Sequence, residues 1–483
     1  MQHVLSLVAT DETSLLRCFA LNTTCSKLLV DVIGSLRFPA FEAVVRTSDP
    51  PNVRAPETRP GRDRRNLLNA RHRWTLVILI MCAASLGSVT VACTRAPSFD
   101  DRLSEITRAQ RFSIARWEIA QVLNGGQAEG KIEPQDPYEH VSEFFALTEE
   151  IRLLQGEIYA ISTGDRPGDL QARERELQRL QQRKGALRDG VEWVLGRQVR
   201  EALNQQSLYN PADRYVHLRV AFPPISFTLE PPPHALILSP RDRIESIREI
   251  MLVQHIDRET MESIETQVDA LGVSSLVVDL GGFGGTYPAF VADDASLRYT
   301  IGTATEEWFH HYLFFTPLGF RYLLNAIGIS RNYEIATMNE TLAGIVREEI
   351  ADIVMETHYP PHAVPTIAPA SAEPQFDFSR EMRQLRLAVD KLLVEGQIEE
   401  AETLMEERRQ YLASKGYYIR KLNQAYFAFH GTYADEPTSV DPIGVEMREA
   451  RRQSASLSNF VNVLSVMTSR QDLIEHLEEK TSY

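Results

Sequence analysis

The chain has 483 residues, 43% of them hydrophobic, which is enough for two or three domains with apolar cores. Its 51 basic and 66 acidic residues give a net charge of −15 at pH 7. Nucleic-acid binders usually carry the opposite sign, so we expect no nucleic-acid partner. The four cysteines all lie at or before Cys93. The chain after Cys93 therefore contains neither a disulfide framework nor a thiolate metal site.

Residues 1–73 do not have the pattern of a folded domain. Residues 1–43 are mildly apolar without a clear period, and residues 44–73 hold eight arginines, several prolines and few acidic residues. This composition is typical of a disordered basic leader.

Residues 74–92 form an uncharged apolar run, preceded by basic residues, that is long enough to span a bilayer. The end of this run, Thr90-Val91-Ala92-Cys93, resembles a bacterial lipoprotein signal in which the cysteine receives the lipid, although an aliphatic residue is usual in place of Thr90. Two interpretations stay open: lipidation at Cys93, or a plain membrane anchor with an incidental cysteine. Both predict a protein tethered to the membrane through residues 74–93.

The basic flank precedes the apolar run, so the positive-inside rule places residues 94–483 on the extracytoplasmic face of a bacterial cell envelope. A signal that begins near residue 70 is unusual. One hypothesis is that translation starts close to Leu67 or Leu68 and that residues 1–66 are a mis-assigned start. Peptides from residues 1–60 in the native protein would contradict it.

Residues 100–206 repeat apolar side chains at helical spacing, interrupted by a turn at residues 164–168. This pattern predicts a helical hairpin region.

Residues 215–360 form the predicted core domain. Apolar or alternating runs predict strands at residues 217–222, 225–229, 234–239 and 275–280, and an edge strand at 287–291. A helix is expected at 243–271. The glycines at 281–285 lack a following Lys-Ser/Thr pair and the dinucleotide spacing, which disfavours a phosphate loop. We interpret them as a tight turn or flexible rim beside a cleft.

Residues 375–483 are predicted to form a helical C-terminal region that completes the core. Helices are expected as a pair over 379–413, then over 417–432 and 455–480. The predicted fold class is therefore α+β and predominantly helical. A small sheet lies in the core, a helical hairpin precedes it and a helical region follows it.

Two carboxylates and two imidazoles lie together in an apolar, aromatic helix expected at residues 296–315. Glu306 and His310 are four residues apart and share a helix face, with Glu307 beside them. Helix-borne zinc sites use this geometry, with two ligands one turn apart and a carboxylate between them. A second helix follows, for which Asn339 is the expected N-cap, and Glu340 on it is expected to point at Glu306 and His310.

The segments Glu306-Glu307-Trp-Phe-His310 and Asn339-Glu340-Thr-Leu-Ala343 together resemble the zincin metallopeptidases in their gluzincin arrangement. In that family a His-Glu-x-x-His helix is followed by an Asn-Glu-x-x-Ala helix. The stretch Leu422–Tyr433 is similar to an Asn-Asn-Ala segment of predicted bacterial aminopeptidases. The resemblance covers roughly residues 275–435. It departs from the family at Glu306, which stands in the place of the first ligand histidine.

The resemblance implies that His310 and Glu340 bind zinc and that Glu307 is the general base for water attacking a peptide carbonyl. Glu306 would then be the remaining ligand, which its carboxylate chemistry permits. An additional carboxylate weakens the metal as a Lewis acid and favours harder ions, so Mn²⁺ or Fe²⁺ are alternatives to Zn²⁺.

Further polar residues are candidates for supporting roles. His311 could orient Glu307 or replace His310 as a ligand, and Asn339 belongs to the second motif. Tyr312, His430 and Tyr433 are candidates for stabilising the oxyanion.

The expected function is a membrane-tethered, zinc-dependent metallopeptidase-like hydrolase acting on peptide or protein substrates. One alternative is a catalytically degenerate zincin-like surface binding or scaffold protein, in which Glu306 records a lost ligand. A helical interaction protein on a stalk is a further class, and a buried polar network without metal is another interpretation of the cluster. The substrate, the metal and the oligomeric state are not defined by the sequence.

Overall fold

The computed structural model describes residues 97–123, 133–217, 219–326, 329–330, 332–360, 376–431 and 442–481. These residues belong to one compact unit, Arg95–Tyr483. The predicted leader and anchor, including Cys93, lie outside the described residues, and so does Tyr433.

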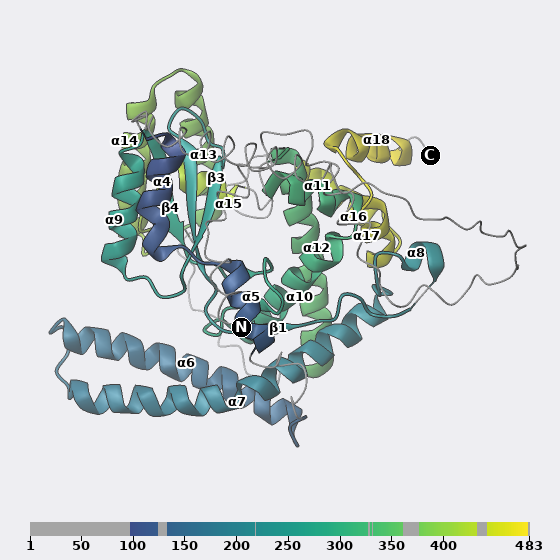
Figure 1. Ribbon diagram of the computed structural model, residues 1–483, viewed down its shortest axis with the longest axis horizontal. Helices are drawn as coiled ribbons and strands as arrows, with labels where there is room; N and C mark the ends of the chain where they lie inside the picture. Colours follow the sequence, from purple (N-terminus) through teal and green to yellow (C-terminus); the bar gives the residue numbers. More distant parts are fainter. Residues whose placement is uncertain are drawn as a thin grey trace, which may run out of the picture. The chain divides into compact units, whose positions relative to one another are not determined.

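The fold is α+β and mostly helical, as predicted, and it begins with a helical hairpin. The first helices are α4 (Phe99–Thr107), the 3₁₀ turn η1 (Arg108–Gln110) and α5 (Ile114–Leu123). The hairpin follows as α6 (Pro137–Ser162) and α7 (Leu170–Gln205), which pack side by side along their length (Figure 1). Asp136 and Asp169 cap the two helices by accepting hydrogen bonds from backbone N–H groups.

The larger three-stranded sheet has β2 (His234–Pro240) at its centre, antiparallel to β3 (Arg248–Leu252) and β4 (Val273–Val278). Strand alternation gives this sheet two apolar faces. Leu236 and Leu238 pack toward α4 and α9 (Arg258–Asp269), whereas Ala235 and Ile237 pack toward α15 (Gln424–His430). Helices on both faces explain why β2 is almost continuously buried.

The smaller sheet has the order β1–β6–β5. Strand β1 (Phe227–Leu229) is parallel to β6 (Ala289–Val291), which is antiparallel to β5 (Gly282–Phe283). The predicted edge strand at 287–291 is therefore the central strand. The glycine segment supplies the edge, because it forms a short strand rather than a free rim.

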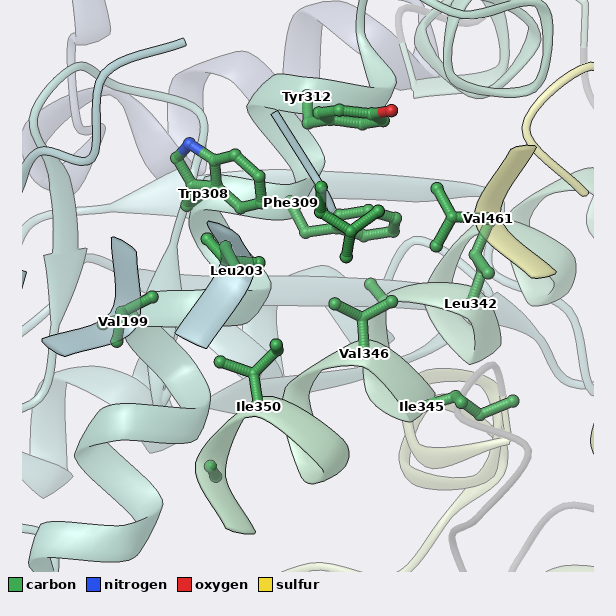
Figure 2. Packing of buried hydrophobic residues seen from close by; sticks show 14 of the residues in the cluster. Val199, Leu203, Trp308, Phe309, Tyr312, Leu342, Ile345, Val346, Ile350 and Val461 are labelled. Atoms are coloured by element: carbon green, nitrogen blue, oxygen red, sulfur yellow. The ribbon is translucent and has the colours of Figure 1, made fainter. Parts of the chain in front are cut away.

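The largest hydrophobic core lies around α10 (Leu297–Leu313) and α12 (Tyr333–His358), with α11 (Pro317–Ala326) between them in the chain. Figure 2 shows aromatic side chains of α10 packed among aliphatic ones from α7, α12 and α17 (Leu457–Leu464). The labelled residues are Trp308, Phe309, Tyr312, Val199, Leu203, Leu342, Ile345, Val346, Ile350 and Val461.

The C-terminal region is helical, as predicted, but its elements are shorter than expected. The pair at 379–413 is confirmed as α13 (Phe378–Val394) and α14 (Ile398–Ser414). The helix predicted over 417–432 is wrong before Gln424, because Asn423 caps α15 at that point. The single helix predicted over 455–480 is instead α17 and α18 (Arg470–Thr481), preceded by α16 (Ile443–Arg452). Asp472 accepts the N–H groups of Thr468 and Ser469 where the chain turns between them.

The helix predicted over 243–271 is also wrong in its first half. Residues 248–252 form β3, which hydrogen-bonds to β2, and only Arg258–Asp269 is helical. A free sheet edge offers backbone partners, and this tertiary pairing overrides the local helical preference.

The strand predicted at 217–222 is wrong as well. The short helix α8 (Asp213–Val216) ends just before this stretch, and the described residues 217 and 219–222 are irregular. The two prolines that follow lack N–H groups and cannot extend a ladder.

None of the helices within the described residues combines the length and the apolar character needed to cross a bilayer.

Candidate metal site and its surroundings

Glu306, His310 and Glu340 come together between α10 and α12. One ligand atom from each residue lies within 4.8 Å of those from the other two. The two glutamates are 6% and 7% exposed. Two ligands about 2.1 Å from one ion lie at most about 4.2 Å apart, so shifts of about 1 Å would close this group on a metal. The sequence-predicted ligand set is thus brought together and could hold a metal ion.

His310 is oriented by a residue of the neighbouring helix. Its Nδ1 lies 3.1 Å from Oδ1 of Asn339. An amide oxygen only accepts, so Nδ1 carries the hydrogen and the lone pair is on Nε2. Nε2 faces Glu340, with Nε2 and Oε2 3.6 Å apart. This is the arrangement in which an imidazole is presented to a metal.

Asn339 is therefore not the N-cap of the second helix, which corrects the sequence prediction. Asn332 caps α12 by accepting from the N–H of Ile335. Asn339 lies two turns further along, fully buried at the contact with α10.

Tyr322 on α11 contacts both Glu340 and His310. Its hydroxyl donates a hydrogen bond to the carboxylate of Glu340. Its ring stacks on the His310 ring, with centroids 6.0 Å apart and an angle of 18° between the planes. The buried carboxylates raise the pKa of Tyr322 well above its usual value, with Glu340 contributing most. Tyr322 thus stays protonated and remains a donor to Glu340.

Glu306 has a cationic partner. The guanidinium of Arg347, from α12, lies 2.6 Å from Oε2 of Glu306. The other carboxylate oxygen, Oε1, takes no part in this contact. Glu306 is therefore both a member of the possible ligand group and the partner of Arg347 in an ion pair.

Glu307 is enclosed by the glycine segment. It is 9% exposed and accepts a hydrogen bond from the backbone of Gly284. A Cβ added to Gly282 would lie 2.2 Å from Oε1 of Glu307, and one added to Gly284 would lie 2.6 Å from Oε2. A side chain at either position would therefore push the Glu307 carboxylate aside. The glycine segment therefore packs directly against the Glu307 side chain. The sequence had suggested a tight turn or a flexible rim beside a cleft.

The pKa of Glu307 is raised to about 8, mainly by burial. Glu306 and Glu340 add to this increase, whereas His310 and the Gly284 hydrogen bond oppose it. Burial also raises the pKa of Glu340, and burial acts to lower the pKa of His310. For His310 the three surrounding carboxylates prevail and its pKa is raised. Like charges packed this closely favour a cation, whether a proton or a metal.

We expect Gly284→Ala to displace the Glu307 carboxylate, because the added Cβ would lie 2.6 Å from its Oε2, and to lower the hydrolysis implied by the sequence resemblance while metal binding persists. Steady-state rates and metal stoichiometry of the variant test this. Gly156→Ala is the matched control: it lies on α6 with nothing within 4 Å of the added Cβ. Unchanged hydrolysis by Gly284→Ala would contradict the proposed contact.

His311 of α10 contacts the glycine segment and is not part of the ligand group. Its Nε2 is 2.8 Å from the carbonyl oxygen of Gly284, and its ring lies 5.6 Å from that of Tyr287. Because a carbonyl only accepts, Nε2 carries the hydrogen. His311 therefore fixes the same segment whose backbone contacts Glu307.

The oxyanion candidates are placed differently. Tyr312 belongs to the hydrophobic core, where its ring stacks on Phe309 with centroids 5.4 Å apart (Figure 2). His430 lies at the end of α15, with its ring 4.3 Å from that of Tyr426. Neither belongs to the three-residue group, and Tyr433 is outside the described residues.

Burial lowers the pKa of His430 to about 4, below the value of about 6.5 expected in the unfolded chain. Between these values the unfolded state binds more protons, so His430 lowers the free energy of unfolding as pH falls from about 6.5 to 4. Thermal unfolding of His430→Gln should accordingly depend less steeply on pH in this window than that of the wild type. Parallel pH profiles would show that His430 is accessible to protons in the folded state.

Sequence reasoning missed Tyr322 and Arg347, and it gave no role to Glu249 of β3. Neighbouring groups remove part of the hydration of the Glu249 carboxyl and raise its pKa, and Glu340 adds to the effect, while the residue as a whole is exposed on β3. No motif marks these residues. For Arg347 the available signal was its spacing of seven residues from Glu340, two helical turns along the same face.

Comparison of the chain with protein-family models, with curated proteins and with solved structures gave no match.

Proposed function

We propose that this protein is a metal-dependent hydrolase of the peptidase type, zincin-like in its core and tethered at the extracytoplasmic face of the membrane. This proposal rests on the Glu306–His310–Glu340 group, whose ligand atoms lie within 4.8 Å of one another beside a third buried acid, Glu307. Peptides or proteins are the proposed substrates.

The proposed roles follow from the contacts of each side chain. Glu306, His310 and Glu340 would hold the ion, with Nε2 as the imidazole donor. The bound metal would supply a Lewis acid that polarises a carbonyl and makes water more acidic. Zn²⁺ is the first candidate, and the two carboxylate ligands also suit Mn²⁺ or Fe²⁺.

Glu307 would accept the proton of the attacking water and later deliver it to the leaving amine. Its position beside the group supports this role, and Gly284 holds its carboxylate in place. Burial raises the pKa of Glu307 to about 8 without a metal, and a bound cation would lower it, so that the carboxylate is ionised and can accept a proton.

A second candidate function is a non-catalytic zincin-like binding or scaffold protein. The ion pair between Arg347 and Glu306 favours it, because Glu306 already has a cationic partner without a metal. Such a pair could hold α10 and α12 together on its own.

The decisive experiment is metal analysis of the full chain in detergent, after chelation and incubation with Zn²⁺, Mn²⁺ or Fe²⁺. The enzyme proposal expects one equivalent of metal and hydrolysis of a peptide library. Bound metal without turnover would favour the scaffold, and no bound metal at all would rule out the enzyme.

A further inference from the structure

The side chain of Arg347 can reach Glu306 because the residue that it passes on α10 is a glycine. Its side chain runs from α12 past Gly302 of α10, where an added Cβ would lie 3.1 Å from both Cγ and Nε of Arg347. Its guanidinium carbon lies 4.6 Å from the centre of the Tyr299 ring. A helix glycine and an aromatic face thus fix the guanidinium at Glu306.

The pair is mostly buried, and the geometry leaves one ligand atom free. The side chain of Glu306 is 8% exposed and that of Arg347 is 20% exposed. Arg347 takes Oε2 at 2.6 Å, and Oε1 remains for another partner. With Arg347 present, the Glu306 carboxylate has a cationic partner on one oxygen and a fixed orientation.

The charges of the site point the same way. Replacing a neutral imidazole ligand by a carboxylate adds one negative charge, and a guanidinium 2.6 Å away offsets one. The other carboxylates, Glu340 and Glu307, have no Lys or Arg within 4.0 Å among the described residues. The compensating cation is therefore placed at the one position where the ligand is unusual.

We propose that Arg347 is a positioning residue that makes Glu306 usable as a metal ligand, so that the Glu306–Arg347 pair replaces a single neutral histidine. This inference rests on the proposed metal site and specifies which residue tunes it. It also implies that substitutions of Glu306 and Arg347 are coupled in their effect on metal affinity.

The test is a double-mutant cycle of metal affinity in the full-length protein, with Zn²⁺ measured by chelator competition and Co²⁺ by its ligand-field spectrum. Arg347→Met should weaken Zn²⁺ binding about 10- to 100-fold, the range for lost support of a metal ligand. Arg347→Lys should restore part of the affinity, because it returns the charge but not the planar fork.

The sign of the Arg347→Met effect should reverse when Glu306 is replaced by His. Glu306→His alone leaves Arg347 with only the half-exposed Glu348, 3.6 Å from its Nε, and next to a neutral ligand, so its charge opposes the metal. Glu306→His/Arg347→Met should therefore bind Zn²⁺ more tightly than Glu306→His. If Arg347 had only a structural role, Arg347→Met would change the Zn²⁺ affinity in the same direction in the wild type and in Glu306→His.

Arg298→Met is the matched control. Arg298 also joins α10 to α12, with its guanidinium 2.7 Å from Glu348 and from Asp352, but on an exposed face. Arg298→Met should leave the metal affinity unchanged. Thermal unfolding of each variant without metal shows whether a substitution has destabilised the fold. Unchanged or tighter binding by Arg347→Met would overturn the inference while leaving the proposed function intact. If the wild type binds no metal but the double variant does, the Arg347–Glu306 pair closes the site and both proposals fall.

Discussion

Replacing Glu307 by Gln should lower peptide hydrolysis by about 10²- to 10⁴-fold, the usual contribution of a general base. The amide has nearly the same shape and its oxygen can still accept from the Gly284 backbone. It cannot take a proton from water. Because Glu307 is not in the ligand group, metal stoichiometry should stay the same.

The experiment compares kcat/KM and bound metal for Glu307→Gln and for Glu400→Gln. Glu400 is an exposed glutamate of α14 and provides the same chemical change away from the site. Full activity of Glu307→Gln would exclude Glu307 as the base. Loss of metal together with activity would show instead that Glu307 is itself a ligand.

The second large effect is expected for His310→Ala, which should abolish stable metal binding. His310 is the one nitrogen donor of the three-residue group, and its removal leaves Asn339 and Glu340 without their partner. Loss of a supporting residue alone costs about 10- to 100-fold in affinity, and loss of a ligand should cost more. Hydrolysis should disappear with the metal.

Thermal unfolding with and without Zn²⁺ measures this directly. A ligand at 100 times its Kd stabilises the folded state by about 2.7 kcal/mol, and this increment should vanish in His310→Ala. His255→Ala, at an exposed histidine after β3, should keep it. A variant lacking His310 that still gains stability from zinc would place the metal elsewhere, with His311 as the next residue to test.

The elements that could be predicted from the sequence are those whose pattern is local. The hairpin α6–α7 and the pair α13–α14 follow from helical spacing interrupted by turn residues. Strand β3 could not be predicted in this way, because residues 248–252 become a strand only by pairing with β2. The N-cap of α12 was misplaced for a related reason: Asn339 has the chemistry of a cap but is held in the helix interior by His310.

The sequence by itself determined which residues could form the ligand group. Glu306 and His310 share a face because a helix brings residues four apart together, whatever surrounds it. What only the tertiary structure decided is the chemical state of that group. Arg347 of α12 contacts Glu306 across 41 residues of sequence, and Gly284, just after the edge strand β5, lies against Glu307 of α10. Such contacts depend on how α10 and α12 pack and on where β5 ends, and no periodicity in the chain records them. The charge of the site, and with it the choice between ligand and ion pair at Glu306, is therefore a property of packing.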